Sequence, residues 1–69
     1  MSRPPALARQ KRIGAVLVDH DGARWRKVRR LDPDAYRDAV LDAAASARVV
    51  GRVTVDELVR LGWERVPQN

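Results

Sequence analysis

The stretch from Ile13 to Arg30, I-G-A-V-L-V-D-H-D-G-A-R-W-R-K-V-R-R, constrains the fold more than any other part of the chain. An apolar run, residues 15–18, is followed by a turn sequence and then by a basic run, which predicts two antiparallel strands in a hairpin. Asp19 to Gly22 fits a type I turn with a left-handed glycine in a bulged loop, and a two-residue primed turn at Asp21-Gly22 is the alternative. The two registers differ by one residue and place every side chain on opposite faces of the sheet. The pattern therefore leaves open whether Trp25 is buried.

A long helix is predicted directly after the hairpin. Asp32 fits the N-cap and Pro33 the first helical position, and the helix is expected to run to about Ala47. Spacings of three and four place one set of residues on its apolar face, with Ala35 and Ala39 beside them: Tyr36, Val40, Ala43, Ala44 and Ala47. Another set is expected to face water: Arg37, Asp38, Asp42 and Ser46. Residues 48–53 are either a short strand or the exit of this helix, closed by Gly51.

A short capped helix and a short strand are predicted at the C-terminal end. Thr54 and Glu57 form a capping box for a helix over 55–61, and Gly62 fits the position that ends it. Residues 63–66 alternate apolar and polar like an edge strand, and Pro67 ends the pattern. Together the elements predict an α+β fold, in which a hairpin with a possible third strand packs on one longer and one short helix.

The chain length predicts one small domain. Sixty-nine residues without cysteine can bury only a thin core, which favours self-association as a homodimer. Residues 1–12 are basic and contain Pro4-Pro5, so we expect a flexible basic arm there and a single α+β domain over 13–69. No apolar stretch reaches membrane-spanning length and the arm lacks the core of a signal peptide, so we expect a soluble, cytoplasmic protein without a membrane partner.

The distribution of charge suggests a polyanionic partner. Residues 1–30 contain nine Lys or Arg against two acids, whereas residues 31–69 contain five against seven. A basic strand with a central aromatic residue is typical of nucleic-acid binding, where cations neutralise phosphates and the ring stacks on a base or sugar. The sequence therefore predicts a regulatory nucleic-acid-binding protein, with DNA preferred over RNA. The expected contacts are Arg24, Trp25, Arg26, Lys27, Arg29 and Arg30 of the hairpin and Arg9, Lys11 and Arg12 of the arm.

Two other interpretations of the basic strand remain open. Trp25 can belong to the core while the arginines form a solvated face. Alternatively, the protein is an interaction module or an inhibitor of a host factor, with Trp25 or Trp63 exposed as an anchor and arginines around it.

Catalysis and metal binding have little support in the sequence. His20 is the only histidine and sits at the expected hairpin tip, without a second acid or base group placed near it. With one histidine and no cysteine a zinc site cannot be assembled, and a calcium loop around Gly22 has only Asp19 and Asp21 as correctly placed ligands. The glycines are isolated and do not form a phosphate-binding loop. We expect no enzymatic activity, no metal and no cofactor.

Two resemblances accompany these patterns. Residues 51–63, G-R-V-T-V-D-E-L-V-R-L-G-W, resemble the first helix and turn of a helix-turn-helix, but the six residues that follow, Pro67 among them, leave no room for a recognition helix. The motifs V-x-V-D-x-D-G-x-x-W and G-W-x-x-V, in an Arg/Ala/Val-rich chain without cysteine, resemble small proteins of actinobacterial phages. That resemblance implies no particular activity, although such proteins are often regulators or inhibitors of a host factor.

Overall fold

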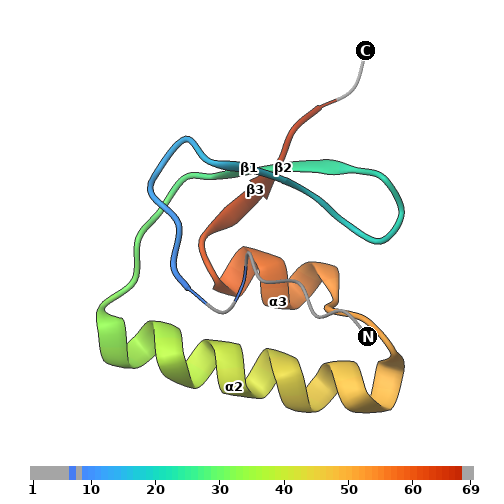
Figure 1. Ribbon diagram of the computed structural model, residues 1–69. Helices are drawn as coiled ribbons and strands as arrows, with labels where there is room; N and C mark the ends of the chain where they lie inside the picture. Colours follow the sequence, from blue (N-terminus) through green and yellow to red (C-terminus); the bar gives the residue numbers. More distant parts are fainter. Residues whose placement is uncertain (1–6, 8, 68–69) are drawn as a thin grey trace.

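The computed structural model describes residues 7 and 9–67 of the chain. Its elements are β1 (Val16–Val18), β2 (Arg24–Lys27), α2 (Pro33–Val50), α3 (Val55–Arg60) and β3 (Trp63–Arg65). The strands form one antiparallel sheet in the order β1-β2-β3, and both helices lie on the same side of it (Figure 1). The predicted α+β fold, with a hairpin, a third strand, one longer helix and one short helix, is confirmed.

The hairpin adopts the bulged loop. Leu17 pairs with Trp25, and beyond the ladder the Asp19 N–H donates to the carbonyl of Ala23 at 2.9 Å. The Gly22 N–H donates to the carbonyl of Asp19 at 3.0 Å, and Gly22 has a φ of 87°. No non-glycine residue in the described ranges has positive φ, which the primed alternative requires at its first central position. This register places the Trp25 side chain on the helix-facing side of the sheet, where it is 1% exposed.

Helix α2 extends three residues beyond the predicted end. Asp32 caps its start, since the side chain accepts a hydrogen bond from Asp34 N at 3.1 Å. Gly51, with a φ of 95°, ends the helix by donating its N–H to the carbonyl of Ala47 at 2.7 Å. Residues 48–50 are therefore helical rather than a strand, because a glycine in the left-handed conformation can terminate the helix only after them.

The buried face of α2 is narrower than predicted and slightly rotated. Its buried residues are Tyr36, Ala39 and Ala43. Ala44 is exposed, whereas Ser46, expected to face water, is half-buried. Hydrogen bonding by the Ser46 hydroxyl and by the backbone N–H of Thr54 lowers the pKa of the Glu57 carboxyl in α3. The packing of α3 against α2 therefore decides which side of α2 is covered, and the alanine spacing alone does not.

The capping box of α3 is confirmed. The Glu57 N–H donates to Thr54 Oγ1 at 3.4 Å, and the Thr54 N–H donates to Glu57 Oε1 at 3.0 Å. Leu61 is the C-cap, and Gly62 follows with a φ of 100°. The chain then reverses and enters β3, which is one residue shorter than expected.

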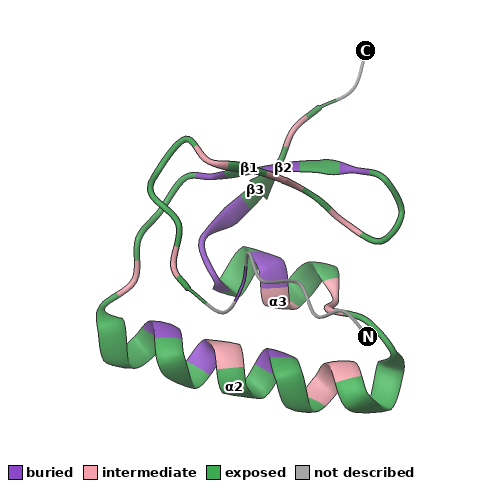
Figure 2. Ribbon diagram, in the orientation of Figure 1, coloured by how far each residue is buried: buried purple, intermediate pink, exposed green. Residues whose placement is uncertain are grey.

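Strand β3 pairs with β2 on the side opposite to β1. Trp63 lies opposite Lys27, and Arg65 lies opposite Trp25. The basic strand β2 is thus the centre of the sheet, with its backbone paired on both sides, rather than half of a free two-stranded ribbon. Figure 2 shows buried positions alternating with exposed ones along β2 and gathered on the inner sides of α2 and α3.

The segment before the hairpin contacts the folded body. Leu7 belongs to the core cluster, and its carbonyl accepts a hydrogen bond of 2.8 Å from the Tyr36 hydroxyl. The Gln10 side chain bonds both backbone groups of Leu31. Two residues of the predicted arm, Leu7 and Gln10, therefore contact the folded domain, and residues 1–6 and 8 of the arm lie outside the described residues.

Candidate nucleic-acid interface

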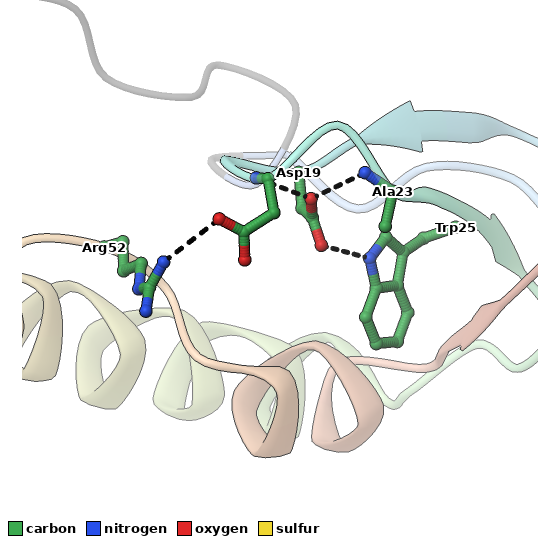
Figure 3. A network of polar contacts seen from close by, with 5 residues as sticks. Asp19, Ala23, Trp25 and Arg52 are labelled. Atoms are coloured by element: carbon green, nitrogen blue, oxygen red, sulfur yellow. Dashed lines mark hydrogen bonds and ion pairs between the residues drawn. The ribbon is translucent and has the colours of Figure 1, made fainter.

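The sequence predicted that Trp25 contacts nucleic acid, but the structure buries Trp25 in the core. Its indole Nε1 donates to Asp19 Oδ2 at 2.9 Å, which fixes the ring beneath the hairpin turn (Figure 3). A ring that is 1% exposed cannot stack on a base. Trp63 is 3% exposed, so the expectation of an exposed tryptophan anchor for a protein partner is also wrong.

The acidic turn around His20 is a structural network. Asp19 Oδ1 accepts from the N–H groups of Asp21 at 2.8 Å and Ala23 at 2.9 Å. The hydrogen bond from the Trp25 indole, followed by those two N–H groups, lowers the pKa of Asp19. Asp21 reaches Arg52 at 3.3 Å and so connects the hairpin tip to the loop between α2 and α3 (Figure 3). These carboxylates are thus occupied by protein donors.

Lys27 was also expected to contact phosphates, and the structure instead buries it completely. Its Nζ donates to the carbonyl of Leu61 at 2.7 Å and to Gln10 Oε1 at 3.2 Å. The ammonium lies 5.1 Å from the ring centre of Tyr36 and 5.7 Å from that of Trp63. The sequence spacing links the burial of Lys27 to that of Trp25, because Lys27 is two residues after Trp25 and so shares its face of the strand.

Burial also lowers the pKa of Lys27. Loss of hydration lowers its pKa from 10.5, and the positive charges of Arg30 and Arg29 lower it further. Lys27 is therefore buried inside the protein and is not part of the contact surface.

Arg29 is exposed but partly engaged within the protein. Its Nη2 donates to the carbonyls of Val59 at 3.1 Å and Arg60 at 3.4 Å. These carbonyls belong to the last turn of α3, where cationic side chains are favourable. Arg29 therefore adds positive charge to this end of the molecule while its guanidinium is held against the helix.

Arg24 and Arg26 lie on the outer face of the sheet, away from the helices. They alternate with the two buried residues of β2 and are both exposed. Val18 of β1 pairs with Arg24, and Val16 pairs with Arg26. Glu64 of β3 lies opposite Arg26 on its other side. The outer face is thus formed by arginines, valines and one acid, and carries no aromatic side chain in the described part of these strands.

A second basic region forms where the segment 9–12 runs beside 28–31. Gln10 Nε2 donates to the carbonyl of Leu31 at 3.0 Å, and the Leu31 N–H donates back to Gln10 Oε1 at 2.7 Å. The Gly14 N–H donates to the carbonyl of Lys27 at 2.8 Å. These bonds place two basic segments side by side (Figure 1). We call this region the basic end; its exposed members are Arg9, Lys11, Arg12, Arg29 and Arg30.

The ion pairs of the described residues lie elsewhere. They are Arg37–Asp34 at 3.3 Å, Arg52–Asp21 at 3.3 Å and Arg60–Asp42 at 2.9 Å. Each uses an arginine from the second half of the chain, and none in the described ranges involves the basic end, Arg24 or Arg26. The acids of the helices therefore leave those cations free for an external anion.

No family model, curated protein or solved structure matches this chain. Within residues 7 and 9–67, no group of three or more His, Cys, Asp or Glu side chains is arranged to hold a metal ion. None of the helices in the same ranges combines the length and apolar character needed to cross a membrane.

Proposed function

We propose that this protein binds nucleic acid, and double-stranded DNA in particular, through contacts to phosphates. The observation that carries the proposal is the hydrogen-bonded alignment of segment 9–12 with segment 28–31. This alignment joins cations from two separate stretches of sequence into one region that is not ion-paired in the described part of the chain. The proposed contacts are Arg9, Lys11, Arg12, Arg24, Arg26 and Arg30, with Arg29 contributing charge.

Phosphates are a better target than bases for this surface. Both tryptophans are buried, and the exposed members of the site are arginine and lysine side chains. Such contacts position a protein on a duplex but carry little sequence information. We therefore propose binding with weak sequence preference and strong dependence on salt concentration.

The test is a fluorescence-anisotropy titration of the full chain with a labelled DNA duplex. If about four phosphates are neutralised, affinity should fall about a hundredfold between roughly 50 and 200 mM salt. The double variant Arg26→Glu/Arg30→Glu should weaken binding more than about tenfold at the lower salt concentration. The matched control is Arg37→Glu/Arg48→Glu, which changes the net charge by the same amount, because both are exposed arginines of α2 outside the proposed surface.

Two outcomes would overturn the proposal. One is absence of binding at the lower salt concentration by a wild-type protein that circular dichroism shows to be folded. The other is equal weakening by the two double variants, which would indicate attraction to the net charge of +5 rather than to this surface. A parallel titration with duplex RNA decides between the two nucleic acids, and tighter binding to RNA would contradict the preference for DNA.

A further inference from the structure

Strand β3 forms one edge of the sheet, and its outer side is unpaired in the described part of the chain. The Val28 N–H donates to the carbonyl of Gly62, and the Val66 N–H donates to the carbonyl of Arg24, both at 2.9 Å. In an antiparallel ladder these bonds alternate along the strand. Between the two bonded positions, the backbone groups of Trp63 and Arg65 consequently point away from β2.

A groove of about 400 Å³ lies beside this free edge, where α3 packs against β3. From α3 it is lined by Val55 and Val59, which are 56% and 51% exposed and are one helical turn apart. From the sheet it is lined by Val28 and by the residues of β3. A strand added to β3 would cover the two exposed valines and extend the sheet over α3.

The indole of Trp63 provides a second, independent observation. Trp63 lines the groove, is 3% exposed, and its Nε1 has no hydrogen-bond partner in the described residues. A buried donor without an acceptor is unfavourable. Binding that gives this N–H an acceptor would therefore be favoured.

The charge around the groove indicates the chemistry of the occupant. Within the described residues its charged lining consists of two cations, Arg29 and Arg65, and one acid, Glu64. A second copy of this chain would bring the same two arginines to the interface and be repelled. An acidic segment would be attracted, and its apolar side chains could pack on Val55 and Val59.

We propose that the free edge of β3 and the adjoining groove bind an extended acidic peptide segment of another protein as a fourth strand. Main-chain hydrogen bonds to Trp63 and Arg65 provide the pairing. Apolar side chains of the peptide cover Val55 and Val59, and its acidic side chains lie by Arg29 and Arg65. The proposal does not depend on nucleic-acid binding, since its main-chain pairing uses the β3 edge and its apolar contacts use α3, and it shares only Arg29 with the basic end.

The experiment is an NMR titration of the ¹⁵N-labelled full chain with the peptide D-D-V-T-V-T-V-D-D. The expected result is saturable shifts of the Trp63 and Arg65 amides and of the Trp63 indole N–H. Methylation of alternate backbone nitrogens of the peptide should abolish these shifts, because it removes the main-chain donors. The variant Val59→Asp should weaken binding at least about tenfold, whereas Val49→Asp, which changes an 86% exposed valine of α2, should not.

A charge reversal makes the test more specific. Arg65→Glu should weaken binding of the acidic peptide and improve binding of K-K-V-T-V-T-V-K-K. The proposal is overturned if the β3 resonances do not shift, if the methylated peptide binds as tightly, or if Val49→Asp weakens binding as much as Val59→Asp. It is also overturned if sedimentation shows a dimer whose formation shifts the same resonances without peptide, because the occupant is then a second copy.

Discussion

The Nζ atom of Lys27 donates a hydrogen bond of 2.7 Å to the carbonyl oxygen of Leu61, and both side chains are completely buried. Leu61 is the C-cap of α3, where carbonyl groups lack partners within the helix. The bond therefore joins the central strand to the end of a helix that lies 34 residues further along the chain. In the described part of the chain the ammonium contacts carbonyl, amide and aromatic groups rather than a carboxylate.

Replacement of Lys27 should affect stability according to how well the new side chain fills the core. Lys27→Ala removes the bond to Leu61 and leaves a cavity, so we expect a loss of about 3 kcal/mol in the free energy of unfolding. Lys27→Met fills most of the space and avoids the burial of an ammonium, so its loss should be about 1 kcal/mol. Urea denaturation measures both, with the exposed neighbour Arg26→Ala as control. Equal losses in the free energy of unfolding for the alanine and methionine variants would contradict the expectation that filling the core limits the loss.

Gly62 should tolerate a side chain less well than Gly51. Both have positive φ, 100° and 95°, so alanine is strained at either position. A Cβ at Gly62 would also collide with the carbonyl oxygen of Arg29, whereas one at Gly51 would meet no atom of the described residues within 4 Å. We expect Gly51→Ala to reduce the free energy of unfolding by about 1 kcal/mol and Gly62→Ala by about 3 kcal/mol or more. Thermal denaturation checks the order, and similar melting temperatures for the two variants would contradict it.

Asp19 should make stability depend on acidity. The indole N–H of Trp25 is the largest cause that lowers its pKa in the folded state below 3.8. The unfolded state therefore binds its proton first as the pH falls, and the stabilisation present above pH 3.8 is lost as the pH drops through the lowered pKa. Asp19→Asn should be less stable than the wild type at neutral pH, with the two curves converging between about pH 5 and pH 2.

The control for this pH series is Asp38→Asn, which changes an exposed side chain of α2 without a hydrogen bond in the described residues. Its unfolding free energy should follow that of the wild type at every pH. Parallel curves for Asp19→Asn and the wild type would show that the bond to Trp25 does not favour the ionised carboxylate.

The salt dependence of DNA binding should distinguish exposed from buried cations. Arg26→Ala removes one proposed phosphate contact, so the slope of log affinity against log salt should decrease in magnitude by about 1. Lys27→Met removes a positive charge of the same strand that is inaccessible to a phosphate. Its slope should equal that of the wild type, and a decrease of about 1 would show that Lys27 reaches the nucleic acid.

Local chemistry in the sequence was sufficient to place most element boundaries. Asp32 with Pro33 starts α2, the Thr54–Glu57 pair starts α3, and Gly62 ends it. Each signal acts within a few residues, since a cap or a glycine satisfies backbone groups of its own turn. The α+β class followed from these elements and from the alternating pattern of the strands.

The composition of the candidate site depended on contacts between distant residues. The sequence identified Arg24, Arg26 and Arg30 as basic positions, but it placed Trp25 and Lys27 with them, because charge and aromaticity do not show which face of a strand is covered. The pairing of segment 9–12 with 28–31 through Gln10 had no local signature.

The sequence by itself thus determined where both helices begin and which glycine follows α3, because hydrogen bonds and backbone conformations within single turns set those points. Only the tertiary structure decided the hairpin register, the central position of β2 and the burial of Lys27. Those features depend on which surfaces α2, α3 and β3 cover when they pack together, and on the free energy of removing Trp25, Tyr36 and Trp63 from water at the same time.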